Sequence, residues 1–141
     1  ERISLIELNY RAAKKAISSS MFSNASHYLK EGISLLEKKH CESHHRLWIS
    51  LYVSYAETEY CNGNFKNVRD TVGSIIAHAK SLDDKVPAYK TLCLCVGSEK
   101  RKNIDATRIG LDVLGQLGEH FTLKRSLVSS LAEIFKTKLL L

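Results

Sequence analysis

Apolar and small side chains recur every three or four residues along almost the whole chain, with polar side chains between them. This spacing places the apolar side chains on one face of an amphipathic α-helix, whereas a half-buried strand would alternate with a period of two. No segment shows a convincing alternation of that kind. The pattern predicts an all-α fold of seven helices, whose apolar faces begin in order at Leu5, Ala25, Leu47, Phe65, Tyr89, Ile104 and Leu123.

Turn-forming residues separate the predicted helices. Asparagine and glycine at 62–64 end the third helix, and Gly118 ends the sixth. Asp83 and Asp84 offer N-caps for the fifth helix, ahead of Pro87 in its opening turn, where a missing N–H costs little. These signals predict where the helices begin and end.

The connections between consecutive helices are only a few residues long, so each pair should pack as an antiparallel hairpin. Three pairs should stack in chain order, the first joining residues 4–19 to residues 24–38, and a seventh helix should cap the end. At 141 residues the chain is one ordinary domain. The chain opens at Glu1 and ends with the apolar residues 139–141. We therefore expect residues 1–141 to be a single domain cut from a larger protein.

A repeated phenylalanine indicates that the hairpins are related to one another. Phe22 and Phe65 lie 43 residues apart, each at a tight turn just before the second helix of a hairpin, where we expect buried rings. Small residues share one face of the first two helices, which lets paired helices approach closely: Ala13, Ala16, Ala25 and Gly32. This arrangement predicts a tetratricopeptide-like (TPR-like) α-α superhelix, with a period longer than the roughly 34 residues of a standard repeat.

The composition is that of a folded protein with a dispersed basic charge. The chain is 44% hydrophobic and 26% charged, and its net charge of +6 comes from scattered pairs such as Lys14 with Lys15. Aromatic residues do not interleave these basic residues, so the sequence does not favour nucleic-acid binding. No apolar stretch approaches the roughly 18 residues needed to cross a membrane, and no signal peptide is evident. We therefore expect a cytoplasmic protein that does not insert into membranes.

One short segment concentrates metal-binding side chains, namely His40, Cys41, His44 and His45. Two of them could bind zinc, but a closed site needs four ligands in suitable positions. The sequence therefore predicts a polar loop between two helices and no metal. The four cysteines fit no zinc or redox spacing and are expected to be reduced.

Catalytic and nucleotide sites lack their required patterns. A phosphate loop needs a glycine-rich turn followed by Lys and Ser or Thr, whereas the matching spacing from Gly110 to Gly115 is followed by Gln116 and lies in a predicted helix. His45 and Glu42 have no nucleophile tied to them by sequence. We therefore predict no catalytic residue, no cofactor and no small-molecule substrate.

Three segments carry a resemblance to a known family. They are FSNASHYLKEGISLL at 22–36, YAETEYCNGNFKNV at 55–68 and RIGLDVLGQLG at 108–118. They resemble the helical-repeat region of large signalling proteins that join a kinase-like domain, an AAA-type ATPase, this array, a GAF sensor and often a histidine kinase. The resemblance implies that the chain itself is not an enzyme, although its parent protein has an ATPase or kinase.

The sequence leaves three functions open. The first is a non-catalytic scaffold that contacts protein segments, above all other domains of its own chain. The alternative is an independent peptide-binding TPR module, whose groove would be lined from the first helices of two pairs by Tyr10, Lys14, Val53 and Glu57. These residues lack the Lys and Asn constellation of carboxylate-binding TPR proteins. An RNA-binding helical array is a weaker third alternative.

Overall fold

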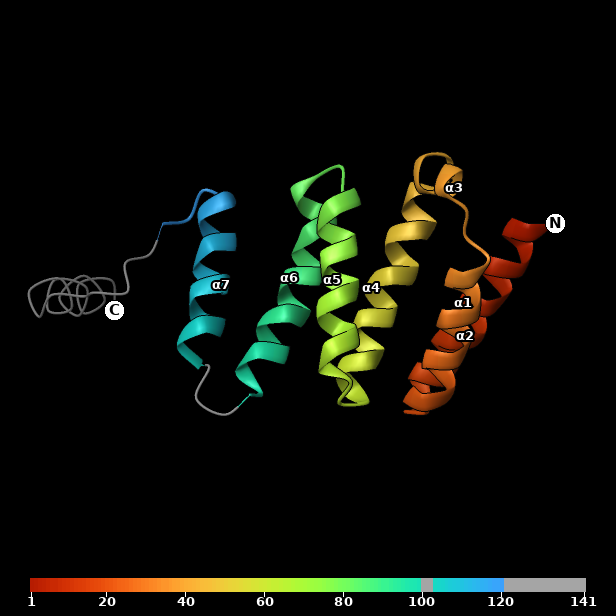
Figure 1. Ribbon diagram of the computed structural model, residues 1–141, viewed down its shortest axis with the longest axis horizontal. Coiled ribbons are helices and arrows are strands. Elements are labelled where there is room, and N and C mark those ends of the chain that lie inside the picture. Colours follow the sequence, from red (N-terminus) through yellow and green to blue (C-terminus); the bar gives the residue numbers. More distant parts are fainter. Residues whose placement is uncertain (100–102, 121–141) are drawn as a thin grey trace, which may run out of the picture.

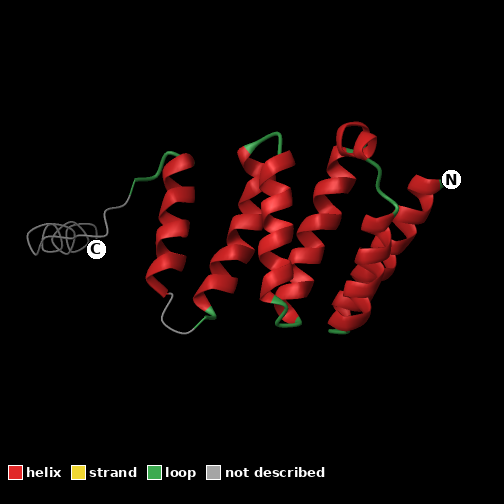
Figure 2. Cartoon of the chain, in the orientation of Figure 1, coloured by secondary structure: helices red, strands yellow, loops and turns green. Residues whose placement is uncertain are grey.

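The computed structural model describes residues 1–99 and 103–120. Helices and their connections account for all of this part, and it contains no strand (Figure 2). The prediction of an all-α fold is confirmed. The helices are α1 (Arg2–Ser18), α2 (Phe22–Ser34), α3 (Lys38–Ser43), α4 (His45–Cys61), α5 (Phe65–His78), α6 (Leu82–Gly97) and α7 (Asn103–Gln116).

Six of the predicted helices correspond to α1, α2, α4, α5, α6 and α7. The seventh predicted helix, which begins near Leu123, lies outside the described residues. The short helix α3 was not predicted, because the segment from His40 to His45 was expected to form a loop. The start of α6 is also a correction: Ser81, and neither Asp83 nor Asp84, is the N-cap, so Pro87 lies inside the helix.

The long helices form a row of antiparallel hairpins (Figure 1). Helix α1 packs against α2, α4 against α5, and α6 against α7. Successive hairpins join where α2 contacts α4 and where α5 contacts α6, and the first helices also contact one another, α1 with α4 and α4 with α6. The predicted pairing of residues 4–19 with residues 24–38, and the stacking of three pairs in chain order, are confirmed.

The turns of the first two hairpins have the same backbone conformation. Ser20 and Gly63 both adopt a positive φ, of 57° and 75°. In each turn the next residue donates its N–H to the carbonyl five residues earlier, Met21 to Ala16 and Asn64 to Glu59, both at 2.9 Å. This is the Schellman arrangement that ends many helices. The phenylalanine that follows is the first residue of α2 or α5, so the predicted positional equivalence of Phe22 and Phe65 holds.

The two phenylalanine rings are less buried than expected. Both are partly exposed to solvent, so neither ring is fully buried. The Phe65 ring packs against the core of the second hairpin and lies 6.2 Å from the ring of Tyr60, centre to centre. The repeated turn geometry, more than the ring, is what the two hairpins share.

Two apolar clusters form the core, and α4 contributes to both. The first lies between α1, α2 and α4 and contains Ile6, Ala13, Leu29 and Leu51. The second lies between α4, α5 and α6 and contains Ala56, Val68, Val72, Ile75, Ala88 and Cys95. Small residues permit the close approach in the first cluster: a Cβ on Gly32 would lie 3.2 Å from Cδ2 of Leu51. Helix α4 therefore holds the first hairpin to the rest of the row.

Candidate functional site

The four residues predicted to line a groove occupy two helices. Tyr10 and Lys14 lie on α1, and the Lys14 ammonium is 5.8 Å from the centre of the Tyr10 ring. Val53 and Glu57 lie on α4. Tyr10 and Val53 are partly buried and pack against the first and second clusters, whereas Lys14 and Glu57 are exposed. A groove lined by these four residues stays a prediction.

The histidine and cysteine segment is helical, which corrects the expectation of a loop. His40 and Cys41 lie on α3, His44 forms the junction, and His45 begins α4. The His40 ring is buried, and its Nδ1 accepts the backbone N–H of Glu37 at 2.9 Å. Burial, followed by the charge of Lys39, lowers the pKa of His40. An Nδ1 that accepts an N–H cannot carry a proton itself, so this hydrogen bond favours the neutral ring, as burial does.

The other two histidines of this segment bind different partners. His44 Nδ1 lies 2.9 Å from the Ser43 hydroxyl. His45 Nδ1 lies 3.2 Å from the carbonyl oxygen of Cys41, and its Nε2 lies 2.9 Å from Oδ2 of Asp84. In the described part of the chain, no three side chains of His, Cys, Asp or Glu come together as a metal site would require.

The contact between His45 and Asp84 joins the start of α4 to the start of α6. Asp84 Oδ2 also accepts the backbone N–H groups of Lys80 and Ser81, at 3.0 and 3.2 Å. The hydrogen bond from His45 is the main reason that the pKa of Asp84 falls below its ordinary 3.8. The backbone N–H groups of Lys80 and Ser81 lower the pKa of Asp84 further, because they donate to the ionised carboxylate.

We expect Asp84→Asn to destabilise the fold slightly and to reduce its sensitivity to acid. A carboxyl group whose pKa is lower in the folded state stabilises the fold above its unfolded pKa, and this contribution is lost as pH falls through the folded value. The contact between His45 and Asp84 is partly exposed to solvent, so the loss should be about 0.5 to 1 kcal/mol. Urea unfolding at about pH 5 and about pH 3 should show the difference between variant and wild type shrinking at the lower pH. If the difference in free energy of unfolding between the variant and the wild type were the same at both pH values, the prediction would be wrong.

A buried carboxylate forms the best-connected polar contact in the described structure. Glu59, on α4, is 1% exposed. Its Oε1 accepts the Ser26 hydroxyl of α2 at 2.5 Å, and its Oε2 accepts the side-chain amides of Asn64 and Asn67 at 3.1 and 2.5 Å. Nearby, the Asn62 side chain donates to the carbonyl oxygen of Phe22 at 3.2 Å. These bonds hold the two repeated turns together.

Sequence reasoning missed Glu59, although a signal was present. Glu59 lies three and four residues after Ala56 and Tyr55, at a position where the helical spacing places the buried face of α4. A charged side chain at such a position needs partners. Three asparagines follow within eight residues, at 62, 64 and 67, and two of them supply those partners.

A pocket of about 480 Å³ opens beside the unpredicted helix α3. The α2–α3 connection, α3, α4 and α5 all contribute to its wall. The lining residues are Leu36, Glu37, Cys41, Glu42, Trp48, Tyr52, Ser74 and His78. A smaller hollow, of about 200 Å³, lies beside the turn between α1 and α2. Neither includes any of the four predicted groove residues.

Aromatic rings form one wall of the larger pocket. The Trp48 and Tyr52 rings stack one helical turn apart on α4, with centres 4.1 Å apart and planes at 20°. The His78 ring, on α5, lies 5.2 Å from Trp48. Burial raises the pKa of Tyr52, and the nearby Cys41 thiol adds to the shift. This wall is therefore aromatic and well packed, as the walls of many ligand-binding pockets are.

No protein-family model, curated protein or solved structure matched the chain. Its candidate functions therefore rest on the residues and contacts described above.

Proposed function

We propose that the chain is a non-catalytic, TPR-like helical-repeat scaffold that acts through protein–protein contacts. The observation that carries the proposal is the contact pattern of the row: among the described helices, each hairpin packs mainly on its neighbours in the chain, and the first helices touch one another. Stacked repeats share this nearest-neighbour pattern and use the extended surface it creates for binding. The similar turns at Ser20 and Gly63 support a repeat.

Exposed apolar side chains support contact with other proteins. Leu5 and Leu8 lie three residues apart on α1, at one end of the row, and are 47% and 53% exposed. Leu94 on α6 is 46% exposed. Apolar side chains at the end of a stack of repeats are where a further repeat or a neighbouring domain would pack. No helix in the described part of the chain is both long and apolar enough to span a membrane.

The resemblance of residues 22–36 and 55–68 supplies the proposed context, a cytoplasmic signalling protein with an ATPase and a kinase. In that context the partners are other domains of the same chain. The adjoining sequence in the gene tests this directly. A phosphate-loop ATPase before the array and a GAF or kinase motif after it would support the proposal, whereas their absence would favour the independent peptide-binding module.

The chain should bind neither nucleotide nor zinc with micromolar affinity. The histidines at 40, 44 and 45 make separate hydrogen bonds within the fold, so a metal ion would have to break them. Calorimetry with ATP and magnesium, and then with zinc, should show no saturable heat, where a micromolar Kd would mean about 8 kcal/mol of binding. One-to-one zinc binding that Cys41→Ser abolishes would overturn the prediction.

A further inference from the structure

The pocket beside α3 differs in charge from the rest of the molecule. The chain has 21 Lys and Arg residues against 15 Asp and Glu, and a net charge of +6. The pocket lining nevertheless includes two carboxylates, Glu37 and Glu42, and no lysine or arginine. These carboxylates are the groups of the lining that could attract a cation.

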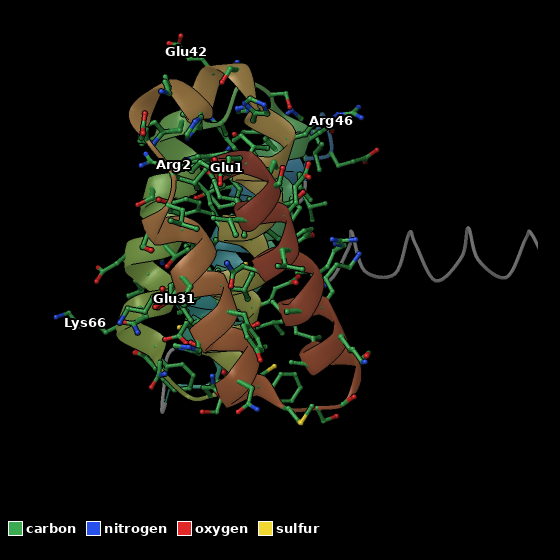
Figure 3. All side chains as sticks on the ribbon, turned by 90° about the vertical axis from the view of Figure 1, so that its right-hand side faces the viewer. Glu1, Arg2, Glu31, Glu42, Arg46 and Lys66 are labelled. Carbon is green, nitrogen blue, oxygen red and sulfur yellow. The ribbon has the colours of Figure 1, made fainter. Side chains whose placement is uncertain are left out.

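The two carboxylates are not equally available. Glu37 already pairs with Arg2, and also with Lys39 at 2.7 Å. Glu42 forms no ion pair among the described residues and is exposed at the tip of α3, where its side chain points outward (Figure 3). Of the two lining carboxylates, Glu42 is therefore the one with no ion pair among the described residues.

The other polar atoms of the lining are suited to accept hydrogen bonds. His78 Nδ1 lies 2.9 Å from the carbonyl oxygen of Ser74, which can only accept. In the neutral ring the proton therefore lies on Nδ1, and Nε2 is left as an acceptor. The Ser74 hydroxyl donates to Asp70 and keeps its own lone pairs. Trp48 is only 5% exposed and stacks on Tyr52, so Tyr52, which is partly exposed, is the more accessible ring of this wall. Together with Tyr52, these groups suit a flat cation with several N–H donors.

We propose that this pocket receives an arginine side chain of a partner protein. This inference rests on the proposed scaffold function and names the chemistry of one of its contacts. A guanidinium group stacks on aromatic rings, donates up to five hydrogen bonds and pairs with carboxylates in a fixed geometry. The volume of about 480 Å³ is ample for such a side chain. Arginine is also enriched among the residues that contribute most to protein interfaces.

The single tryptophan of the chain, Trp48, provides the test, because its emission reports on the pocket wall. The 141-residue chain would be titrated at low salt with acetyl-Gly-Arg-Gly-amide and with the same peptide carrying citrulline, a neutral isostere of arginine. The arginine peptide should bind about 5-fold more tightly, as expected for one exposed carboxylate and a cation–π contact. Calorimetry on the same samples would detect binding that does not change the Trp48 emission. Equal affinities for the two peptides, or no saturable binding by either measurement, would overturn the inference.

A matched pair of variants separates the pocket from general charge. Glu42→Gln should weaken binding of the arginine peptide about 3-fold and leave the citrulline peptide unaffected. Glu31→Gln makes the same change of charge on α2, lower on the molecule (Figure 3), and should change neither affinity. An equal loss in both variants would show non-specific attraction and contradict the proposal. Failure here leaves the scaffold function standing, since the adjoining sequence tests that separately.

Discussion

Glu59→Ala should lower the free energy of unfolding by about 3 to 5 kcal/mol, because it leaves several buried donors without an acceptor. In the native fold Ser26, Asn64 and Asn67 all donate to this one carboxylate. Leaving a buried polar group unpaired costs about 1 to 3 kcal/mol, and the cavity left by the side chain adds to the loss. Some relaxation of the asparagines toward solvent keeps the total below the sum of these costs.

Urea denaturation followed by circular dichroism measures the change, and the same helix supplies its control. Glu57 is also a glutamate on α4, two residues earlier, but it is exposed. Glu57→Ala should change the stability by less than about 0.5 kcal/mol. If Glu59→Ala cost less than about 1 kcal/mol, water would be replacing the carboxylate as acceptor. The contact between the two repeated turns would then not depend on Glu59. The contrast between two glutamates of one helix then isolates burial and hydrogen bonding from charge.

The sequence predicted the hairpins because their signals are local. Helical spacing and the turn at 62–64 lie within single segments, and short connections leave few ways to pair the helices. The recurrence of Phe22 at Phe65 pointed to a repeat, and what the structure shows the two hairpins to share is the geometry of their turns. Ser20 has the positive φ that Gly63 has. A serine in that conformation gives no sequence signal of the kind a glycine gives.

Helix α3 and the pocket beside it could not be predicted in the same way. Six residues are too few to show a helical period, and the cap at Glu37 uses His40 where the usual capping signal is Glu or Gln. The pocket brings together α3, α4 and α5, and two of its lining residues, Ser74 and His78, lie more than 20 residues after the others in the sequence. Trp48 and Tyr52 both lie on α4, but the His78 ring that lies close to Trp48 comes from α5. Such contacts depend on tertiary packing.

Leu51→Ala should cost about 3 kcal/mol, within the usual range for a fully buried leucine. Leu51 is 0% exposed and lies in the cluster that joins α4 to the first hairpin. Its Cδ2 would be 3.2 Å from a Cβ placed on Gly32, so it packs directly on the backbone of α2. A glycine has no side chain that could move into the space, and the cavity should therefore persist.

The control for this change is another leucine in a helix, Leu94 of α6, which is 46% exposed. Leu94→Ala should cost less than about 1 kcal/mol in the same urea titration, since far less apolar surface is buried there.

A second substitution tests the cavity itself. In the wild type, Gly32→Ala should be close to neutral, because its gain in helix propensity of about 1 kcal/mol is offset by crowding against Leu51. In the Leu51→Ala background that crowding is gone, so the same substitution should restore about 1 kcal/mol. Equal effects in the two backgrounds would mean that Leu51 and Gly32 do not meet, and that the first hairpin is held to α4 in some other way.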